Sequence, residues 1–105
     1  MLSSRATASI ALFLQNDEYF LPVLRLLVRQ IEMMHKKGLK LEYVSLRVDV
    51  DERGDYVAYA KLDGADRTVT GNLKGKNELE VVKWLLHRLV DAFQARVKKH
   101  RLTFE

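Results

Sequence analysis

The sequence predicts an α+β domain in which an antiparallel sheet of three or four strands packs on two helices, in the order β-α-β-β-β-α. Three observations predict it. Apolar and polar residues alternate between residues 41 and 71, apolar residues recur at three- and four-residue spacing on either side, and glycine-containing turns separate the alternating segments. A chain of 105 residues has the size of one domain, so a single domain over residues 1–105 is expected.

The first element, within residues 6–15, can be interpreted in two ways. Ala8, Ile10, Leu12 and Leu14 alternate as the residues of a strand do, whereas Ile10 with Phe13 and Leu14 also suits a helix. The strand is favoured, which places this segment beside the other strands. If it is helical, the order becomes α-α-β-β-β-α.

The first helix is predicted from about Leu21 to Lys37. Pro22 then falls in the first turn, where its missing N–H costs nothing, and Gly38 follows the helix as a C′ residue. The apolar stripe of this helix is expected to consist of Phe20, Leu24, Leu27, Ile31 and Met34.

Three strands are predicted next, joined as an antiparallel meander: Leu41–Asp51, Tyr56–Leu62 and Arg67–Gly71. Glu52-Arg53-Gly54 supplies the first turn, because Gly54 tolerates a positive φ. The acidic residues around that turn follow the first half of a calcium loop, but Ala60 stands where the bidentate glutamate is needed, so calcium is not expected.

The last helix is predicted from about Asn77 to His100, with Asn77 as N-cap and Glu80 as its partner three residues on. Its stripe is expected to contain Leu79, Val82, Leu86, Leu89, Phe93 and Val97. The predicted core comprises Leu24, Leu27, Ile31, Leu46, Val48, Leu62, Leu86, Leu89 and Phe93. Apolar residues beside the two helical stripes are candidates for an interface with a second subunit: Leu26, Met33, Leu85 and Val90. Trp84 is interpreted as a core-edge or interface residue.

Composition excludes several classes of site. The chain has no cysteine, which excludes disulfides, thiolate metal sites and cysteine nucleophiles. His35, His87 and His100 are not at metal-ligand spacing and are expected to be solvated. The sequence therefore predicts no enzyme, no cofactor and no metal. Because no run of 18 apolar residues exists, no membrane contact is expected, and the cytoplasm is the expected location.

The positive charge is concentrated in the last third of the chain. Residues 73–105 carry eight Lys and Arg against four Asp and Glu, a balance of +4, whereas residues 39–72 have a balance of −2. A basic edge on the last helix and in the glycine-containing loop before it would contact phosphates. The predicted nucleic-acid-binding residues are Lys74, Lys76, Lys83, Arg88, Arg96, Lys98, Lys99 and Arg101. Glu78 and Glu80, in the first helical turn, oppose an anion there.

A second candidate surface is the outer face of the sheet. Arg47, Tyr59 and Lys61 are predicted to share it, since each lies at an outward position of its strand. A polar sheet face with an aromatic residue suits RNA stacking.

The chain resembles two RNA-associated families in topology. The stretches Tyr43–Val48 and Ala60–Gly64, followed by a long helix ending in Lys98-Lys99-His100, are similar in spacing to ribosome hibernation-promoting factors. The helix, meander and helix also resemble a double-stranded-RNA-binding domain, although that domain has lysines where Glu78 and Glu80 stand.

Two functions stay open at this point. The first is a binding module for RNA or the ribosome. The alternative is a protein-interaction or dimerisation module, such as a small regulator or inhibitor of another protein.

Overall fold

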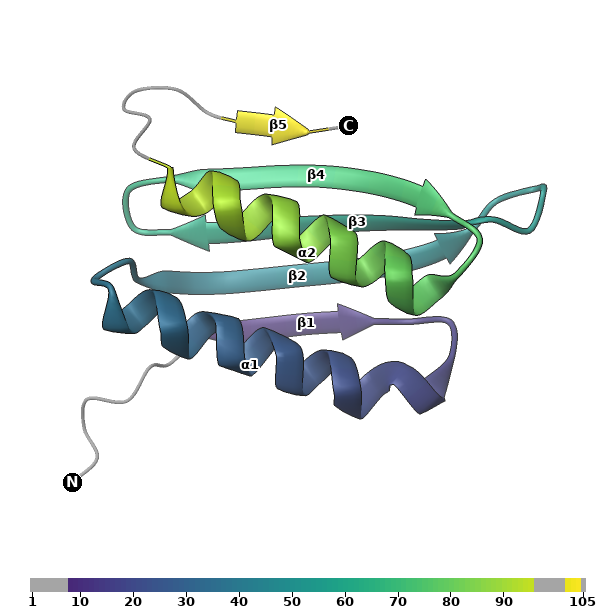
Figure 1. The fold of residues 1–105 in the computed structure, drawn as a ribbon, viewed down its shortest axis with the longest axis horizontal. Helices are drawn as coiled ribbons and strands as arrows, with labels where there is room; N and C mark the ends of the chain where they lie inside the picture. Colours follow the sequence, from purple (N-terminus) through teal and green to yellow (C-terminus); the bar gives the residue numbers. More distant parts are fainter. Residues whose placement is uncertain (1–7, 96–101, 105) are drawn as a thin grey trace.

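A five-stranded sheet carries both helices on one of its faces (Figure 1). The computed structural model describes residues 8–95 and 102–104. The elements are β1 Ser9–Phe13, a 3-10 turn Asp17–Tyr19, α1 Phe20–Lys36, β2 Leu41–Val50, β3 Tyr56–Gly64, β4 Thr68–Gly75, α2 Glu78–Gln94 and β5 Leu102–Phe104. The strands lie side by side in chain order, so the predicted α+β class and element order are confirmed, with β5 added at the far edge.

The predicted meander is present. β2 and β3 pair antiparallel, with Leu46 opposite Ala60, and β4 pairs antiparallel with β3. Gly54 closes the first turn with φ of 87°, as its predicted role requires. The third strand continues to Gly75, four residues beyond the predicted end. The sequence did not predict this extension, because glycines stand at two of the inward-facing positions, Gly71 and Gly75, where an alternating strand would have apolar side chains.

The first segment is a strand, which resolves the alternative in favour of β1. It pairs parallel with β2, with Ile10 opposite Val44, so the sheet is mixed, although β2, β3 and β4 are antiparallel as predicted. The reason is the connection. A strand that reaches its neighbour through a helix on one face returns to the same end of the sheet and then runs in the same direction.

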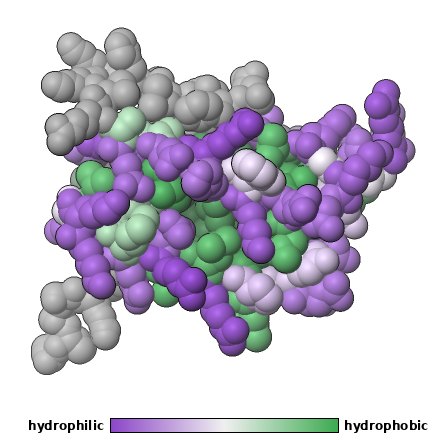
Figure 2. All heavy atoms as spheres, viewed as in Figure 1, coloured by the Kyte–Doolittle hydropathy of each residue, from purple (hydrophilic) through white to green (hydrophobic). Residues whose placement is uncertain are grey.

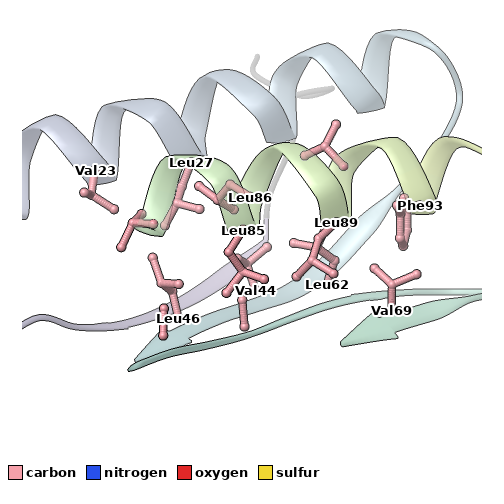
Figure 3. Packing of buried hydrophobic residues seen from close by; sticks show 14 of the residues in the cluster. Val23, Leu27, Val44, Leu46, Leu62, Val69, Leu85, Leu86, Leu89 and Phe93 are labelled. Atoms are coloured by element: carbon pink, nitrogen blue, oxygen red, sulfur yellow. The ribbon is translucent and has the colours of Figure 1, made fainter. Parts of the chain in front are cut away.

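The core lies between the sheet and the two helices (Figure 3). Side chains of α1 and α2 point toward Val44 and Leu46 of β2, Leu62 of β3 and Val69 of β4. All of the predicted core residues are buried except Leu24, which is half-buried. Val23 takes its place in a stripe with Leu27, Ile31 and Met34, and Phe20 is exposed. Val23 fits this stripe because it lies one turn before Leu27, at four-residue spacing.

The predicted interface residues on α2 prove to be core residues. Leu85 and Val90 are buried within the chain itself, so their assignment to a subunit interface is wrong. Leu26 and Met33 of α1 are half-buried against the same core. The cause is the position of α2, which packs on β3 and β4 and also contacts α1. Its buried surface is therefore wider than one stripe, and Trp84 alone of the residues considered for an interface is exposed.

The second helix ends at Gln94, six residues before the predicted end at His100. Arg67, between β3 and β4, donates hydrogen bonds to the carbonyls of Phe93 and Ala95, at 2.6 and 3.1 Å, and its guanidinium lies 5.6 Å from the Phe93 ring. Ala95 is extended, with ψ of 149°. A cation that satisfies the last carbonyls stabilises a helix end at that point.

The start of α2 is fastened by a buried carboxylate. Asn77 caps the helix as predicted, its side chain accepting from the Glu80 backbone N–H. Glu78 is only 2% exposed and accepts from the backbone N–H of Gln15 at 2.7 Å and of Asn16 at 2.9 Å. It also accepts from the Asn16 amide at 2.7 Å. We call these contacts the Glu78 clamp; it ties the segment after β1 to the start of α2.

Candidate nucleic-acid interface

The structure divides the predicted binding residues between two surfaces. Lys83 and Arg88 lie exposed on α2, and Arg88 borders the same hollow as Lys76, which lies in the connection before the helix. The open face of the sheet, opposite the helices, carries the second group of predicted residues: Arg47, Tyr59, Lys61 and also Lys74. The remaining predicted residues, Arg96, Lys98, Lys99 and Arg101, lie outside the part of the chain that is described.

Two of the predicted lysines are engaged with the acidic hairpin tip. The Lys74 ammonium lies 3.0 Å from Asp51, and the Lys76 ammonium lies 3.0 Å from Asp55. The pairing of β3 with β4 brings the basic loop close to the acidic tip. The Lys74 side chain holds the pKa of Asp51 below its usual value, and Asp55 raises the pKa of Lys76.

Trp84 stands on the outer side of α2 between two hollows. It is 58% exposed, so of the two interpretations given to it the core-edge one is wrong, and the interface one stays a prediction. One hollow lies between α2 and β4 and is bordered by Leu73, Lys76, Val81 and Arg88 as well as Trp84. The other is bordered by Glu80, Lys83 and His87. Two predicted phosphate-binding residues, Lys83 and Arg88, therefore lie on either side of one exposed indole.

The open face of the sheet carries more aromatic residues than the sequence indicated. Phe13 of β1, Arg47 of β2 and Tyr59 of β3 are cross-strand neighbours in one row, and Phe13 and Tyr59 are 57% and 43% exposed. The Arg47 guanidinium lies 5.6 Å from the Tyr59 ring and pairs with Asp49 at 2.8 Å. Phe13 was missed because its neighbour across the sheet depends on the parallel pairing of β1.

A basic surface on α1 was also missed. Arg25, Arg29 and Lys36 are exposed and lie on the outer side of the helix, with Glu32 among them. Their spacing of four and seven residues places the three cations on one face, and this spacing could have revealed them.

Figure 2 views the helical side of the molecule and shows hydrophilic residues around an apolar hollow. Leu26 of α1 and Leu86 and Val90 of α2 line a hollow between the helices.

Of the two histidines in the described part of the chain, one forms a hydrogen bond within the fold, and His100 lies outside that part. His35 is half-buried, and its Nε2 atom accepts from the backbone N–H of Leu41 at 3.1 Å, so the prediction that it is solvated is wrong. His87 is exposed and lies 3.6 Å from Asp91.

Within residues 8–95 and 102–104, no three potential ligands cluster as a metal site would require. No helix in this part of the chain is long and apolar enough to span a membrane.

The described residues form a two-layer α+β fold in which both helices lie on one face of the sheet and carry exposed cations on their outer surface. This fold is similar to that of a ribosomal subunit interface protein from Coxiella burnetii, with a TM-score of 0.59 over 81% of this chain and 92% of that chain. The two sequences are 10% identical, so the likeness concerns the fold. The topological resemblance to ribosome hibernation-promoting factors is thereby confirmed at the level of the fold.

No protein family profile matches the sequence. No curated protein matches it either.

Proposed function

We propose that this protein is a binding module that associates with the ribosome by contacting RNA through the outer surfaces of its helices. The observation that carries the proposal is the shared fold with a ribosomal subunit interface protein over most of both chains. The charge distribution supports RNA as the contacted component, because the last third of the sequence has a balance of +4.

Phosphate contacts would come from cations that are not already neutralised. Lys83 and Arg88 are exposed, and no carboxylate forms an ion pair with either among the described residues. Lys74 and Lys76 have carboxylate partners and would contribute less. Arg25 and Arg29 of α1 extend the cationic surface. The basic residues that follow α2, namely Arg96, Lys98, Lys99 and Arg101, are proposed to add to it on the basis of the sequence.

The test is co-sedimentation with isolated ribosomal subunits, together with binding of a structured RNA, at two salt concentrations. The K83E/R88E double variant should bind both at least tenfold more weakly. The slope of the logarithm of the binding constant against the logarithm of the salt concentration should fall in magnitude by about one to two. Each phosphate contact that is lost means that about one fewer counterion is released on binding.

The matched control is K40E/R53E. It changes the net charge equally at two exposed positions outside both helices, in the loop before β2 and at the hairpin tip. It should bind nearly as the unaltered protein does. The absence of any binding to subunits or RNA at low salt would overturn the proposed function. Equal losses in the two double variants would show a response to net charge rather than to this surface.

One observation favours a second function, self-association through the open sheet face. Exposed Phe13, Tyr43 and Tyr59 lie there among interleaved basic and acidic residues, a pattern that complements a second copy of itself. The Y59E variant should then shift a concentration-dependent dimer toward monomer without lowering the free energy of unfolding. A monomer at all concentrations would exclude this function.

A further inference from the structure

Trp84 occupies a position that packing does not require. It is the single tryptophan of the chain and is 58% exposed, although the helix that carries it is buried along a wide face. Tryptophan offers a large flat surface for contact with another ring, and its exposure to water is unfavourable unless a ligand covers it.

Both sides of the indole adjoin open space. The hollow toward β4 has an apolar floor formed by Leu73 and Val81, which are half-buried and buried. Gly75 borders this hollow and lets the helix lie close to the strand, since a Cβ there would stand 2.7 Å from the Val81 side chain. The hollow on the other side adjoins Lys83 and His87. A planar group could therefore lie against the indole.

Positive charge flanks the ring on both sides. Lys83 comes directly before Trp84, and Arg88 follows it by one turn. On the helix surface the two cations therefore lie on opposite sides of the indole, one beside each hollow. Lys76 stands at the end of the hollow toward β4, where Asp55 partly neutralises it. The acidic residue that borders both hollows is Glu80, and Asp91 lies one turn beyond His87. The surface suits a flat ring joined to anions on either side.

We infer that Trp84 is a stacking platform for an unpaired RNA base, with Lys83 and Arg88 contacting the phosphates that flank that base. This inference rests on the proposed function and makes it more specific. A base within a duplex has both faces covered by its neighbours, so only an unpaired or splayed-out base can lie on the indole. The protein should therefore prefer single-stranded or bulged RNA to a continuous duplex.

The intrinsic fluorescence of Trp84 provides the test, because no other residue contributes tryptophan emission. The probes are a short single-stranded oligoribonucleotide of mixed sequence and a blunt duplex of the same length. The single strand should quench the emission and bind more tightly than the duplex. The W84A variant should bind the single strand roughly five- to a hundredfold more weakly, the range that one stacked base provides.

Two further variants make the test specific. W84F retains a ring and should recover part of the lost binding. Y59A removes an exposed ring from the open face of the sheet. A loss of single-strand binding in Y59A but not in W84A would place the stacked base on that face and overturn the inference. Because Trp84 lies on the surface, W84A should unfold at nearly the same denaturant concentration as the unaltered protein, which separates lost stacking from lost structure.

The outcomes distinguish the inference from the proposed function. Single-strand binding that K83E/R88E weakens but W84A does not, with no quenching, would overturn the stacking role and leave RNA binding intact. No binding of any RNA or subunit would overturn both. Emission that shifts on concentrating the protein alone, together with self-association that W84A abolishes, would assign Trp84 to a protein contact and overturn the inference.

Discussion

The two faces of the sheet differ although the same strands build both. In β2 and β3 the inward residues Val48, Ala58 and Leu62 are at most 2% exposed beneath the helices. Their immediate neighbours Val57 and Tyr59 face away from the helices and lie at least partly in solvent. Successive residues of a strand point to opposite faces of the sheet. Which face a side chain occupies therefore decides whether it stabilises the fold or is available for binding.

The largest effect on stability is expected at the Glu78 clamp, on the helical side of the sheet, because there a carboxylate is buried beside the apolar core. Glu78→Ala would leave the N–H groups of Gln15 and Asn16 without their acceptor. We expect the free energy of unfolding to fall by about 2–4 kcal/mol, since three partly buried donors would lose a charged acceptor. Chemical denaturation measures this. The E80A control, on the exposed neighbour, should cost about 1 kcal/mol or less, and equal losses would contradict a special role for Glu78.

A matched pair of valines compares the faces directly. Val48 is 0% exposed under the helices, and Val57 lies on the open face opposite Asp49. Val48→Ala should lower the free energy of unfolding by about 2–3 kcal/mol, through lost burial and the cavity left behind. The V57A variant should cost about 1 kcal/mol or less. Similar losses in the two denaturation curves would mean that the open face is covered in solution.

The smallest expected effect is the pH dependence of the hairpin tip. The Lys74 ammonium, with the backbone N–H groups of Asp55 and Arg53, lowers the pKa of Asp51 below 3.8. A carboxyl whose pKa is lower in the folded state stabilises the fold above its unfolded pKa and loses that effect as the pH falls through the folded value. Stability should therefore decline slightly more below about pH 4 in the unaltered protein than in the D51N variant. Parallel declines in thermal denaturation would show that this ion pair contributes nothing.

Local patterns were sufficient for much of the fold. The alternation at Val44, Leu46 and Val48 predicted β2, and Asn77 predicted the start of α2 because a cap involves residues only three positions apart. The end of α2 could not be predicted in this way. It depends on Arg67, which lies 26 residues from the carbonyl of Phe93 that it contacts. Likewise, alternation gives the existence of β1 but not its direction.

The candidate site was predictable only in part. Lys83 and Arg88 were identified from charge alone, and both proved to be exposed. Leu85 and Val90 were misjudged because helical spacing does not reveal how wide the buried face of α2 becomes when α1 packs beside it. The structural role of Glu78 was missed because its partners, Gln15 and Asn16, are 63 and 62 residues away in the sequence.

The parallel pairing of β1 has a consequence for the order of folding. The β2–β3 and β3–β4 hairpins join residues close in the chain, whereas Ile10 meets Val44 only after the whole of α1 has been placed. Pairing across such a separation carries a larger loop-closure entropy, so we expect β1 to dock after the transition state has formed the meander. A destabilising change at Ile10 should then mainly accelerate unfolding, and one at Leu46 should slow folding as well.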